Sequence, residues 1–575
     1  AMSPYDEDEA VFAAVMAELK ALPNVKTAAS ADDVLETLQS LGVEPYAGFE
    51  SCQLLTQVRE TEGGNRYLYV YNYCNGTLHD GDDADHGSYA KTEVAMDGTF
   101  VPYQIDAWSG QVTQLADYRW ENGTTVFQVS LDYGDVALYA FEKVQAAPLH
   151  IVDVQRAGAE AAGTVRKIEA EDCQLIHAVR EDYPRVYNDG SASGGKGVDF
   201  IAAQGDGLNL GVLDGPINQI TMSYCTGETG TLGLYADGVW VADVPFTSNG
   251  AWSGKYQTVT FNIRPALKAG AELTLKRKSN SGLNIDYISL GMNEAVETAK
   301  TYVSDMGMKL RATESGVYDV TFSDGKQRQL QVSVPEAYPI TGWNVKVEAW
   351  TEGQEIFRED TQFGVVNREH TFETVKTETE VQLDHMATWD DIPQVGKNVS
   401  GRGYYDATFQ WDGAADGAYL DFGAILNSMK VYINGVQTSD VNMNRPVLDI
   451  SDYLVKGENT IRLVYSSTLT NEMLELGRIR AGYTLNNWGG YYIHYRSYGP
   501  AQAVVVPYVE QNISILENND VTVNLSGKSD VTADVKELSY DVSVSGAEKL
   551  ATATLVFNVE GLVDPTVVPA EGWYV

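Results

Sequence analysis

Two short segments that lie far apart in the chain place the strongest constraint on its fold. The first reads Ile168-Glu-Ala-Glu-Asp172, and the second reads Leu283-Asn-Ile-Asp-Tyr-Ile288. If the first segment is a strand, Glu169 and Glu171 leave the same face, because side chains two apart in a strand point in one direction. Asp286 lies in the second, apolar segment. If the two segments are neighbouring strands, three carboxylates converge.

Three converging carboxylates are typical of a calcium site. Calcium takes six to eight oxygen ligands, some of them backbone carbonyls. The loop Ser191-Ala-Ser-Gly-Gly-Lys-Gly197 offers such carbonyls, because its glycines let the backbone approach closely. The sequence therefore predicts a calcium ion held by Glu169, Glu171 and Asp286. The alternative is an alternating strand whose acids are simply solvated.

These motifs resemble carbohydrate-binding module families 6 and 35. The family hallmarks are an "EAE" first strand, an "SGG" loop and a closing "NIDYI" strand, and all three stand here in that order. The resemblance covers residues 163–293, called the binding module below. It implies a β-sandwich in which Glu169, Glu171 and Asp286 hold a structural calcium ion.

The same resemblance implies a sugar site in the loops near the calcium end. Such a site needs an aromatic platform beside planar hydrogen-bonding groups. Trp252 and Asn284 stand at the matching positions, and Tyr187 is a second platform candidate. Lys196 and Tyr256 are weaker candidates for sugar contacts. The alternative for Trp252 is a partly buried anchor of its loop.

Outside the module the sequence predicts a mainly β protein built from several β-sandwich (jelly-roll) domains, with a small α/β segment at the N-terminus. The 34 tyrosines and 53 glycines suit strands joined by tight turns. Helical spacing of apolar residues occurs in residues 4–45. There we expect two helices, the second capped by Ser30, around a short strand at Val25–Ala28.

The segments on both sides of the module resemble glycoside hydrolase family 106, which is α-L-rhamnosidase-like. Pro102–Gly110 resembles the stretch that closes the catalytic region, and Gly316–Gly325 and Trp343–Trp350 follow the C-terminal order of that family. Ala418–Gly423 and Val431–Gly435 resemble a galactose-binding-like jelly roll. A catalytic (β/α)8 barrel typically needs about 250 residues, so the resemblance implies that catalysis belongs to a domain preceding Ala1.

Six segments follow from these patterns, and residues 294–340 are expected to complete the domain that the binding module interrupts. The expected segments are 1–48, a helical α/β remnant of an upstream catalytic region; 49–162, a β-rich domain; 163–293, the inserted binding module; 294–340, strands completing the preceding β domain; 341–512, a galactose-binding-like jelly roll; and 513–575, a partial cohesin-like or immunoglobulin-like segment.

The charge of the chain limits the partners it can bind, and its four cysteines raise the question of disulfides. The net charge of −40, from 80 acidic and 40 basic residues, argues against nucleic-acid partners, whose phosphates require positive patches. No apolar stretch is long enough to cross a bilayer. Cys52 and Cys74 lie equally far from the turn at Glu62-Gly63-Gly64, so they should face each other across a hairpin, near disulfide distance. Whether a disulfide joins them stays open. Cys173 and Cys225 are expected to be small buried thiols.

Two further clusters have less specific readings. The acidic loop His79–His86 fails as an EF-hand, because Lys91 occupies the position that needs glutamate. The aromatic run Trp488–Tyr498 fits a second sugar platform, an interdomain contact or an ordinary alternating strand.

The sequence thus predicts the accessory part of a secreted or cell-surface bacterial glycoside hydrolase that binds a plant or host glycan. Galactose, rhamnose-containing pectin fragments and uronic acids all fit these residues. Two alternatives stay open. One is a complete hydrolase or lyase that works through its own carboxylates, and the other is a surface adhesin or scaffold.

Overall fold

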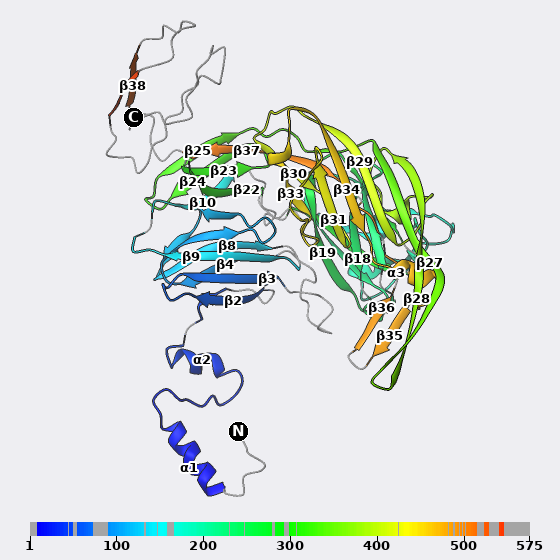
Figure 1. Cartoon of the computed structure of the whole chain (residues 1–575), viewed down its shortest axis with the longest axis horizontal. Helices are drawn as coiled ribbons and strands as arrows, with labels where there is room; N and C mark the ends of the chain where they lie inside the picture. The colour runs from blue at the N-terminus through cyan, green and yellow to red at the C-terminus, as the bar shows by residue number, and fades with distance from the viewer. Residues whose placement is uncertain are drawn as a thin grey trace.

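The computed structural model describes most of the chain. The described residues are 9–43, 45–49, 54–72, 90–131, 134–146, 148–157, 166–228, 230–246, 248–278, 282–292, 298–305, 307–423, 425–480, 482–486, 489–493, 495–496, 498–500, 502–513, 522–527 and 540–545. The protein is mainly β, as predicted (Figure 1). Cys52, Cys74 and the acidic loop 79–86 lie outside the described residues.

The N-terminal segment is helical and projects away from the sheets (Figure 1). Helix α1 spans Glu9–Lys20 and helix α2 spans Val34–Gln39. The strand expected at residues 25–28 is wrong, since the backbone there forms no ladder. Asp33, and not Ser30, precedes the first turn of α2, and Ser30 Oγ donates to the Asp33 carboxylate at 2.8 Å.

The first β domain packs two antiparallel sheets face to face. One sheet has the order β1 (Ala47–Gly48), β4 (Ala90–Asp97), β8 (Thr124–Leu131) and β7 (Arg119–Glu121). The facing sheet begins β2 (Leu54–Glu60), β3 (Arg66–Asn72), β9 (Val136–Lys143), β5 (Phe100–Ile105) and β6 (Val112–Leu115). Leu68, Val70, Phe127 and Phe141 fill the space between them.

That second sheet continues through later parts of the chain into an eleven-stranded sheet. The strands that follow β6 are β22 (Ala299–Ser304), β23 (Gly307–Ala312), β37 (Val504–Asn512), β30 (Gly417–Asp421) and β33 (Val447–Asp449), with β26 (Tyr338–Pro339) beside β37. A separate sheet pairs β10 (Ile151–Ala157) with β24 (Gly316–Phe322), which is followed by β25 (Gln327–Val332). Strands before and after the binding module therefore pair directly with each other.

The binding module is a sandwich of two antiparallel sheets. The first has the order β13 (Arg185–Asn188), β14 (Lys196–Asp199), β21 (Asn284–Gly291), β16 (Ile217–Cys225) and β19 (Gln257–Leu267), with β11 (Arg166–Glu169) also on β21. The second has the order β12 (Gln174–Ile176), β15 (Gly207–Val212), β20 (Glu272–Arg277), β17 (Gly230–Ala236) and β18 (Val239–Phe246). Cys225 is a buried free thiol and Cys173 a half-buried one.

The third body combines β37, β30 and β33 with a six-stranded sheet. The order of that sheet is β28 (Val365–Leu383), β27 (Trp343–Gln362), β29 (Gly401–Trp411), β34 (Gly457–Ser466), β31 (Ser428–Ile433) and β32 (Val436–Gln437). Trp343, Trp389, Tyr405 and Tyr465 form the fully buried aromatic centre of its core. Helix α3 (Thr470–Glu475) follows β34.

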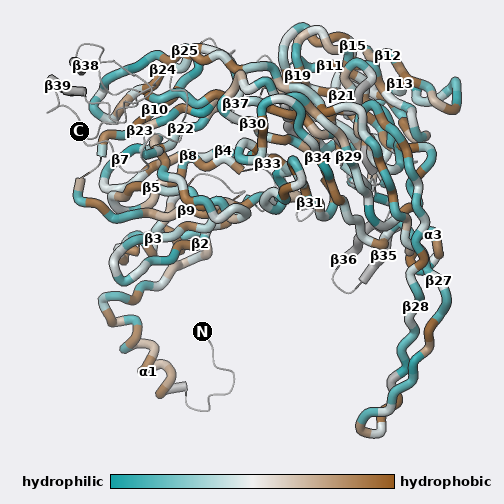
Figure 2. Tube along the Cα trace, turned by 45° about the horizontal axis from the view of Figure 1, so that its top comes forward, coloured by the Kyte–Doolittle hydropathy of each residue, from teal (hydrophilic) through white to brown (hydrophobic). Residues whose placement is uncertain are grey.

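Strands β27 and β28 extend far beyond their neighbours as a two-stranded arm (Figure 2). Strand β27 pairs with β29 only over Asn344–Ala349. The aromatic run at the C-terminal side is described in part: β36 (Gly489–Ile493) pairs with β35 (Gly482–Asn486). In the last segment, β38 (Thr522–Gly527) pairs with β39 (Tyr540–Ser545).

The binding module contacts the third body through a buried lysine. The side chain of Lys278 is 1% exposed, and its Nζ donates to Thr388 Oγ1 at 3.0 Å. Asp391 Oδ2 lies 3.5 Å from the same nitrogen. Among the described residues, no helix has the length and hydropathy needed to cross a membrane.

Candidate functional site

Strands β11 and β21 are neighbours, so the two sequence motifs do meet. They pair antiparallel, with Ile168 opposite Ile288 and Glu169 opposite Tyr287. One detail of the prediction is wrong. Strand β11 ends at Glu169, and Glu171 lies in a 3-10 turn, Ala170–Asp172, so the two glutamates do not share a strand face.

The carboxylates nevertheless gather around the turn Ser193–Gly195. Ser193 Oγ donates to Glu169 Oε1 at 2.9 Å, and the backbone N–H of Ser193 donates to Asp286 Oδ1 at 2.8 Å. Ser223 Oγ donates to the other oxygen of Asp286 at 2.9 Å. Gly194 has φ +66°, and a Cβ there would lie 3.3 Å from Glu171 Oε1, so the glycine makes room for that carboxylate.

The unsatisfied oxygens of this cluster fit a cation. Glu169 Oε2 and Glu171 Oε2 are buried and have no hydrogen-bond partner. Burial raises the pKa of Glu171, and the charges of Glu169, Asp172 and Asp286 raise it further. Burial also raises the pKa of Asp286, and Glu169 adds to that rise. A bound divalent ion would supply the missing ligand and remove the repulsion.

Lys167 supplies part of the missing positive charge. Its Nζ lies 3.0 Å from Glu169 Oε1 and 4.1 Å from the centre of the Tyr287 ring. In the described part of the chain, no group of three His, Cys, Asp or Glu side chains lies close enough together to hold a metal ion as the side chains now stand. The feature that favours calcium here is the pair of buried oxygens, Glu169 Oε2 and Glu171 Oε2.

Trp252 lies on the surface of the module, in the loop between β18 and β19. Its side chain is 48% exposed. The indole packs against Gly227 and Gly282, where an added Cβ would come within 2.8 Å and 2.7 Å of ring atoms. The two glycines thus make room for the ring, and about half of the side chain stays exposed.

Asn284 is buried and positions two loops. It is 5% exposed; its Nδ2 donates to the Trp252 carbonyl at 2.6 Å, and its Oδ1 accepts from the Phe200 N–H at 3.1 Å. One amide side chain therefore links the backbones of Trp252 and Phe200.

Phe200 is a residue of this site that sequence reasoning missed. Its side chain is 52% exposed, and its φ of +57° lies in the left-handed region that a bulky residue rarely adopts. The ring lies 4.8 Å from that of Tyr183. The available signal was an aromatic residue immediately after the alternating strand that follows the "SGG" loop.

Tyr187 and Tyr256 are partly buried and are linked to the Trp252 loop through Asp189. Their hydroxyls lie 2.5 Å apart, and Tyr256 donates to Asp189 Oδ2 at 2.9 Å. The same oxygen accepts from the Gly254 N–H at 2.8 Å. Burial raises the pKa of Tyr187 to about 12 and raises that of Tyr256 as well, so both stay protonated at neutral pH. Lys196 is exposed at the start of β14.

Comparison with known proteins gives only distant likenesses. No family model and no curated protein matches the chain. The structure of a rhamnosidase from Novosphingobium sp. PP1Y is similar over 88% of this chain at 12% identity, with a TM-score of 0.38, and this chain spans 29% of its length.

Two carbohydrate-binding modules of family 6 are also similar. CsCBM6-3 from Clostridium stercorarium, in complex with cellobiose, is 16% identical over 22% of this chain and 94% of its own, with a TM-score of 0.19. CBM6cm-2 from Cellvibrio mixtus lichenase 5A, in complex with cellotriose, is 21% identical over 22% and 98%, also with a TM-score of 0.19. At these scores the likenesses carry no argument about function.

Proposed function

We propose that the binding module is a calcium-dependent carbohydrate-binding module within the non-catalytic part of a secreted bacterial glycoside hydrolase. The observation that carries the proposal is that one buried amide, Asn284, bridges the backbones of Trp252 and Phe200, whose rings are both about half exposed. Rings with a free face stack on the C–H face of a pyranose, and polar neighbours orient its hydroxyls.

The carboxylate cluster supports the same proposal. Glu169, Glu171 and Asp286 would hold the calcium ion, which supplies positive charge between the first and last strands of the module. Ser193 touches both Glu169 and Asp286, so an ion there would also order the loop that leads to β14. Calcium would act on the shape of the site rather than as a reactant.

The chain would serve a catalytic domain that precedes residue 1 in the parent enzyme. A sugar-binding surface on the same polypeptide keeps a polysaccharide near the active site and raises its effective concentration there. Helix α2 has no buried residue, which fits a segment whose packing partner belongs to another domain.

The test is sugar binding by the purified chain. A glycan array on the chain identifies the ligand, and calorimetry then compares variants. We expect Trp252→Ala to weaken binding at least about tenfold, since ring stacking and its buried area together contribute about 1.4 kcal/mol or more. The melting temperature should change little, because half of the indole is already exposed.

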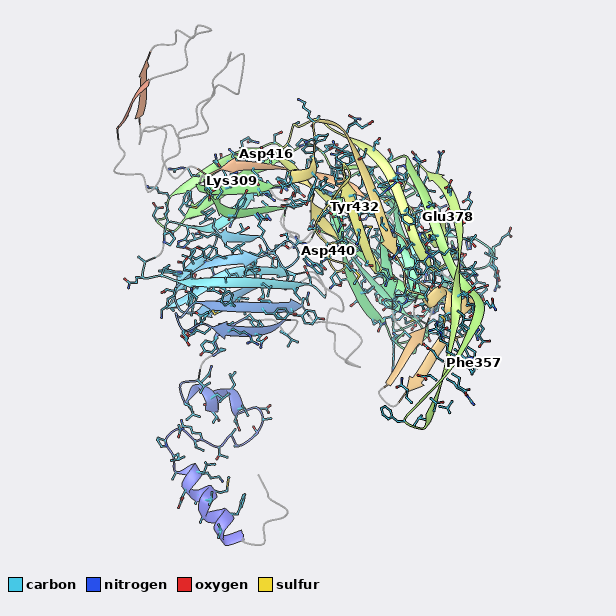
Figure 3. The ribbon with its side chains drawn as sticks, in the orientation of Figure 1. Lys309, Phe357, Glu378, Asp416, Tyr432 and Asp440 are labelled. Atoms are coloured by element: carbon cyan, nitrogen blue, oxygen red, sulfur yellow. The ribbon has the colours of Figure 1, made fainter. Side chains whose placement is uncertain are left out.

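Phe357→Ala is the matched control, because Phe357 also has about half of its side chain exposed, at 52%, but lies on the arm formed by β27 and β28 (Figure 3). Undiminished sugar binding by Trp252→Ala would refute this site. Equal loss in the Phe357 variant would show that the effect of Trp252→Ala is not specific to this site, and would also refute it.

A further inference from the structure

The outer face of the first β domain has an unusual composition. In β3, Leu68 and Val70 point into the core, and Tyr67, Tyr69 and Tyr71 alternate with them on the opposite face. An antiparallel sheet with one face packed normally turns polar side chains to solvent on the other face. Here the solvent face carries a row of tyrosines.

The neighbouring strands place more apolar residues on that face. Strand register sets Leu55 opposite Tyr71, Leu138 opposite Tyr69, Ile105 opposite Leu138 and Val112 opposite Ile105. We call this surface the tyrosine face; its residues are Leu55, Tyr67, Tyr69, Tyr71, Ile105, Val112 and Leu138. Four of them are strongly exposed: Leu55 51%, Tyr67 46%, Tyr69 39% and Val112 59%.

Single exposed apolar residues need no explanation, but a contiguous group marks a contact surface. Trp108, in the turn after β5, is a further exposed aromatic residue in this part of the chain, at 49%. The charged members of the face lie toward one end, where Arg59 stands opposite Tyr67 and Glu142 accepts a hydrogen bond from Tyr103 at 2.9 Å. On a chain of net charge −40, this is a largely neutral surface.

The mixture of side chains indicates a protein partner. Aliphatic residues alternate with the rings, as in protein–protein interfaces, where Tyr and Trp are enriched over an apolar centre. A polysaccharide would gain from the rings but would lose hydration against Leu55, Leu138 and Val112. Packing of another folded element removes all of these side chains from water together.

The N-terminal helices present a second exposed apolar surface beside this sheet. They precede β2, the edge strand of this sheet, and Figure 1 shows α2 next to β2. Their own apolar side chains are exposed as well: Val15 56%, Leu19 45%, Leu35 65% and Leu38 40%. One protein domain that packs on both the tyrosine face and the apolar side chains of α1 and α2 would account for the exposure of both.

We propose that the tyrosine face, together with α1 and α2, is the surface on which the catalytic domain preceding residue 1 packs in the parent enzyme. This rests on the proposed function, since it requires such a domain. It adds that the domain is fixed to the first β domain by an apolar interface and is not merely tethered by a linker.

Hydroxyl-radical footprinting of the full-length parent and of this chain tests the proposal. Tyrosine side chains are modified in proportion to their exposure. We expect modification of Tyr67 and Tyr69 to fall at least about fivefold in the parent, with Phe357 on the arm unchanged as the internal control. Equal modification of the tyrosines in both proteins would overturn the proposal.

A pair of substitutions gives a second, independent measurement. In this chain alone, Leu55→Asp with Tyr69→Asp should leave the melting temperature unchanged or raise it, because the positions are exposed. In the parent the same pair should lower the melting temperature and speed proteolytic cleavage between α1 and β2. Stability that is equally unaffected in both proteins would contradict the interface.

Other occupants are distinguished in the same experiments. If this chain sediments as a dimer that Leu55→Asp dissociates, the face binds a second copy and the proposal fails. It also fails if an insoluble polysaccharide depletes the chain from solution and Tyr69→Ala abolishes that. If no domain precedes residue 1, this inference is overturned, whereas sugar binding through Trp252 is unaffected. A preceding domain that covers the face but has no hydrolase activity would refute the parent enzyme and leave the interface standing.

Discussion

At the scale of single residues, the two buried oxygens Glu169 Oε2 and Glu171 Oε2 set the behaviour of the carboxylate cluster. A ligand that binds only the folded state stabilises it by about 2.7 kcal/mol at one hundred times its dissociation constant. We therefore expect a chelator to lower the melting temperature of the binding module by roughly 5–10 °C, as measured by calorimetry with and without added calcium.

Glu171→Gln should weaken that calcium response, because it removes one of the two orphaned carboxylate oxygens. Glu181→Gln removes an exposed carboxylate from the same module and should keep the full response. A melting curve of the unaltered chain that is identical in chelator and in calcium would discard the metal assignment.

Glu510 is a second residue whose environment has a measurable consequence. Burial alone raises its pKa, but hydrogen bonds from Tyr302, Lys309 and Arg311 outweigh burial and hold the pKa at about 2, below the ordinary 4.5. A lowered carboxyl pKa contributes stability above pH 4.5 that is lost as the pH falls toward 2. We expect denaturant unfolding to show a loss of up to about 3 kcal/mol across this window.

Glu510→Gln should be less stable than the unaltered chain at pH 7 and should lack most of that loss on acidification. Glu369→Gln, an exposed change on the arm, should behave like the unaltered chain. If the Glu510 variant keeps the full acid dependence, the stabilising charge lies elsewhere.

At the scale of elements, the sequence correctly predicted the strands that carry a recognisable motif. Strands β11 and β21 carry motifs whose order indicated their pairing, and the ladder of Ile168 and Ile288 confirms it. Glu171 was assigned to a strand and lies in a 3-10 turn. The sequence could not distinguish the two, because either conformation can bring the carboxylate of Glu171 close to that of Glu169. The strand expected at residues 25–28 failed because no strand in the described ranges pairs with it, and alternation alone cannot supply a partner.

Contacts between distant elements that no sequence motif marks were not predictable. Phe200 acquires its role from the Asn284 side chain, and nothing local marks that hydrogen bond. The same holds for Lys278, which reads as one of several lysines in the module. Only the fold places it against Thr388 and removes it from water.

Lys278 therefore gives a prediction about coupling between the binding module and the third body. Lys278→Ala leaves the hydroxyl of Thr388 and the carboxylate of Asp391 without this donor. Asp391 is 27% exposed and can regain water, so we expect a cost of about 1–2 kcal/mol rather than that of a fully buried pair. Calorimetry should show the module unfolding as a separate, earlier transition.

Lys255→Ala, at an exposed position, should preserve the original profile. A single transition in both variants would show that Lys278 does not couple the two bodies.

At the scale of the whole molecule, strand pairing supports the proposal that residues 163–293 are an insertion. Arg166 pairs with Leu290, so the two ends of the module lie side by side. Strands on the two sides of the module also pair with each other, since Ala157 in β10 lies opposite Val317 in β24 and Leu115 in β6 lies opposite Tyr302 in β22. Insertions are tolerated where the chain ends meet at the surface of a domain.

Replacing residues 163–293 with a short Gly/Ser linker should therefore leave a folded protein. The β10–β24 ladder and the eleven-stranded sheet contain no strand of the module, so their cores stay intact. The melting temperature should fall only by a few degrees, because Thr388 and Asp391 lose Lys278 and become solvated. Circular dichroism and sedimentation check the outcome. An aggregated or unfolded product would show that the module is an integral part of the surrounding core. The pairing of Ala157 with Val317 would then be too weak to hold the domain together after the module is removed.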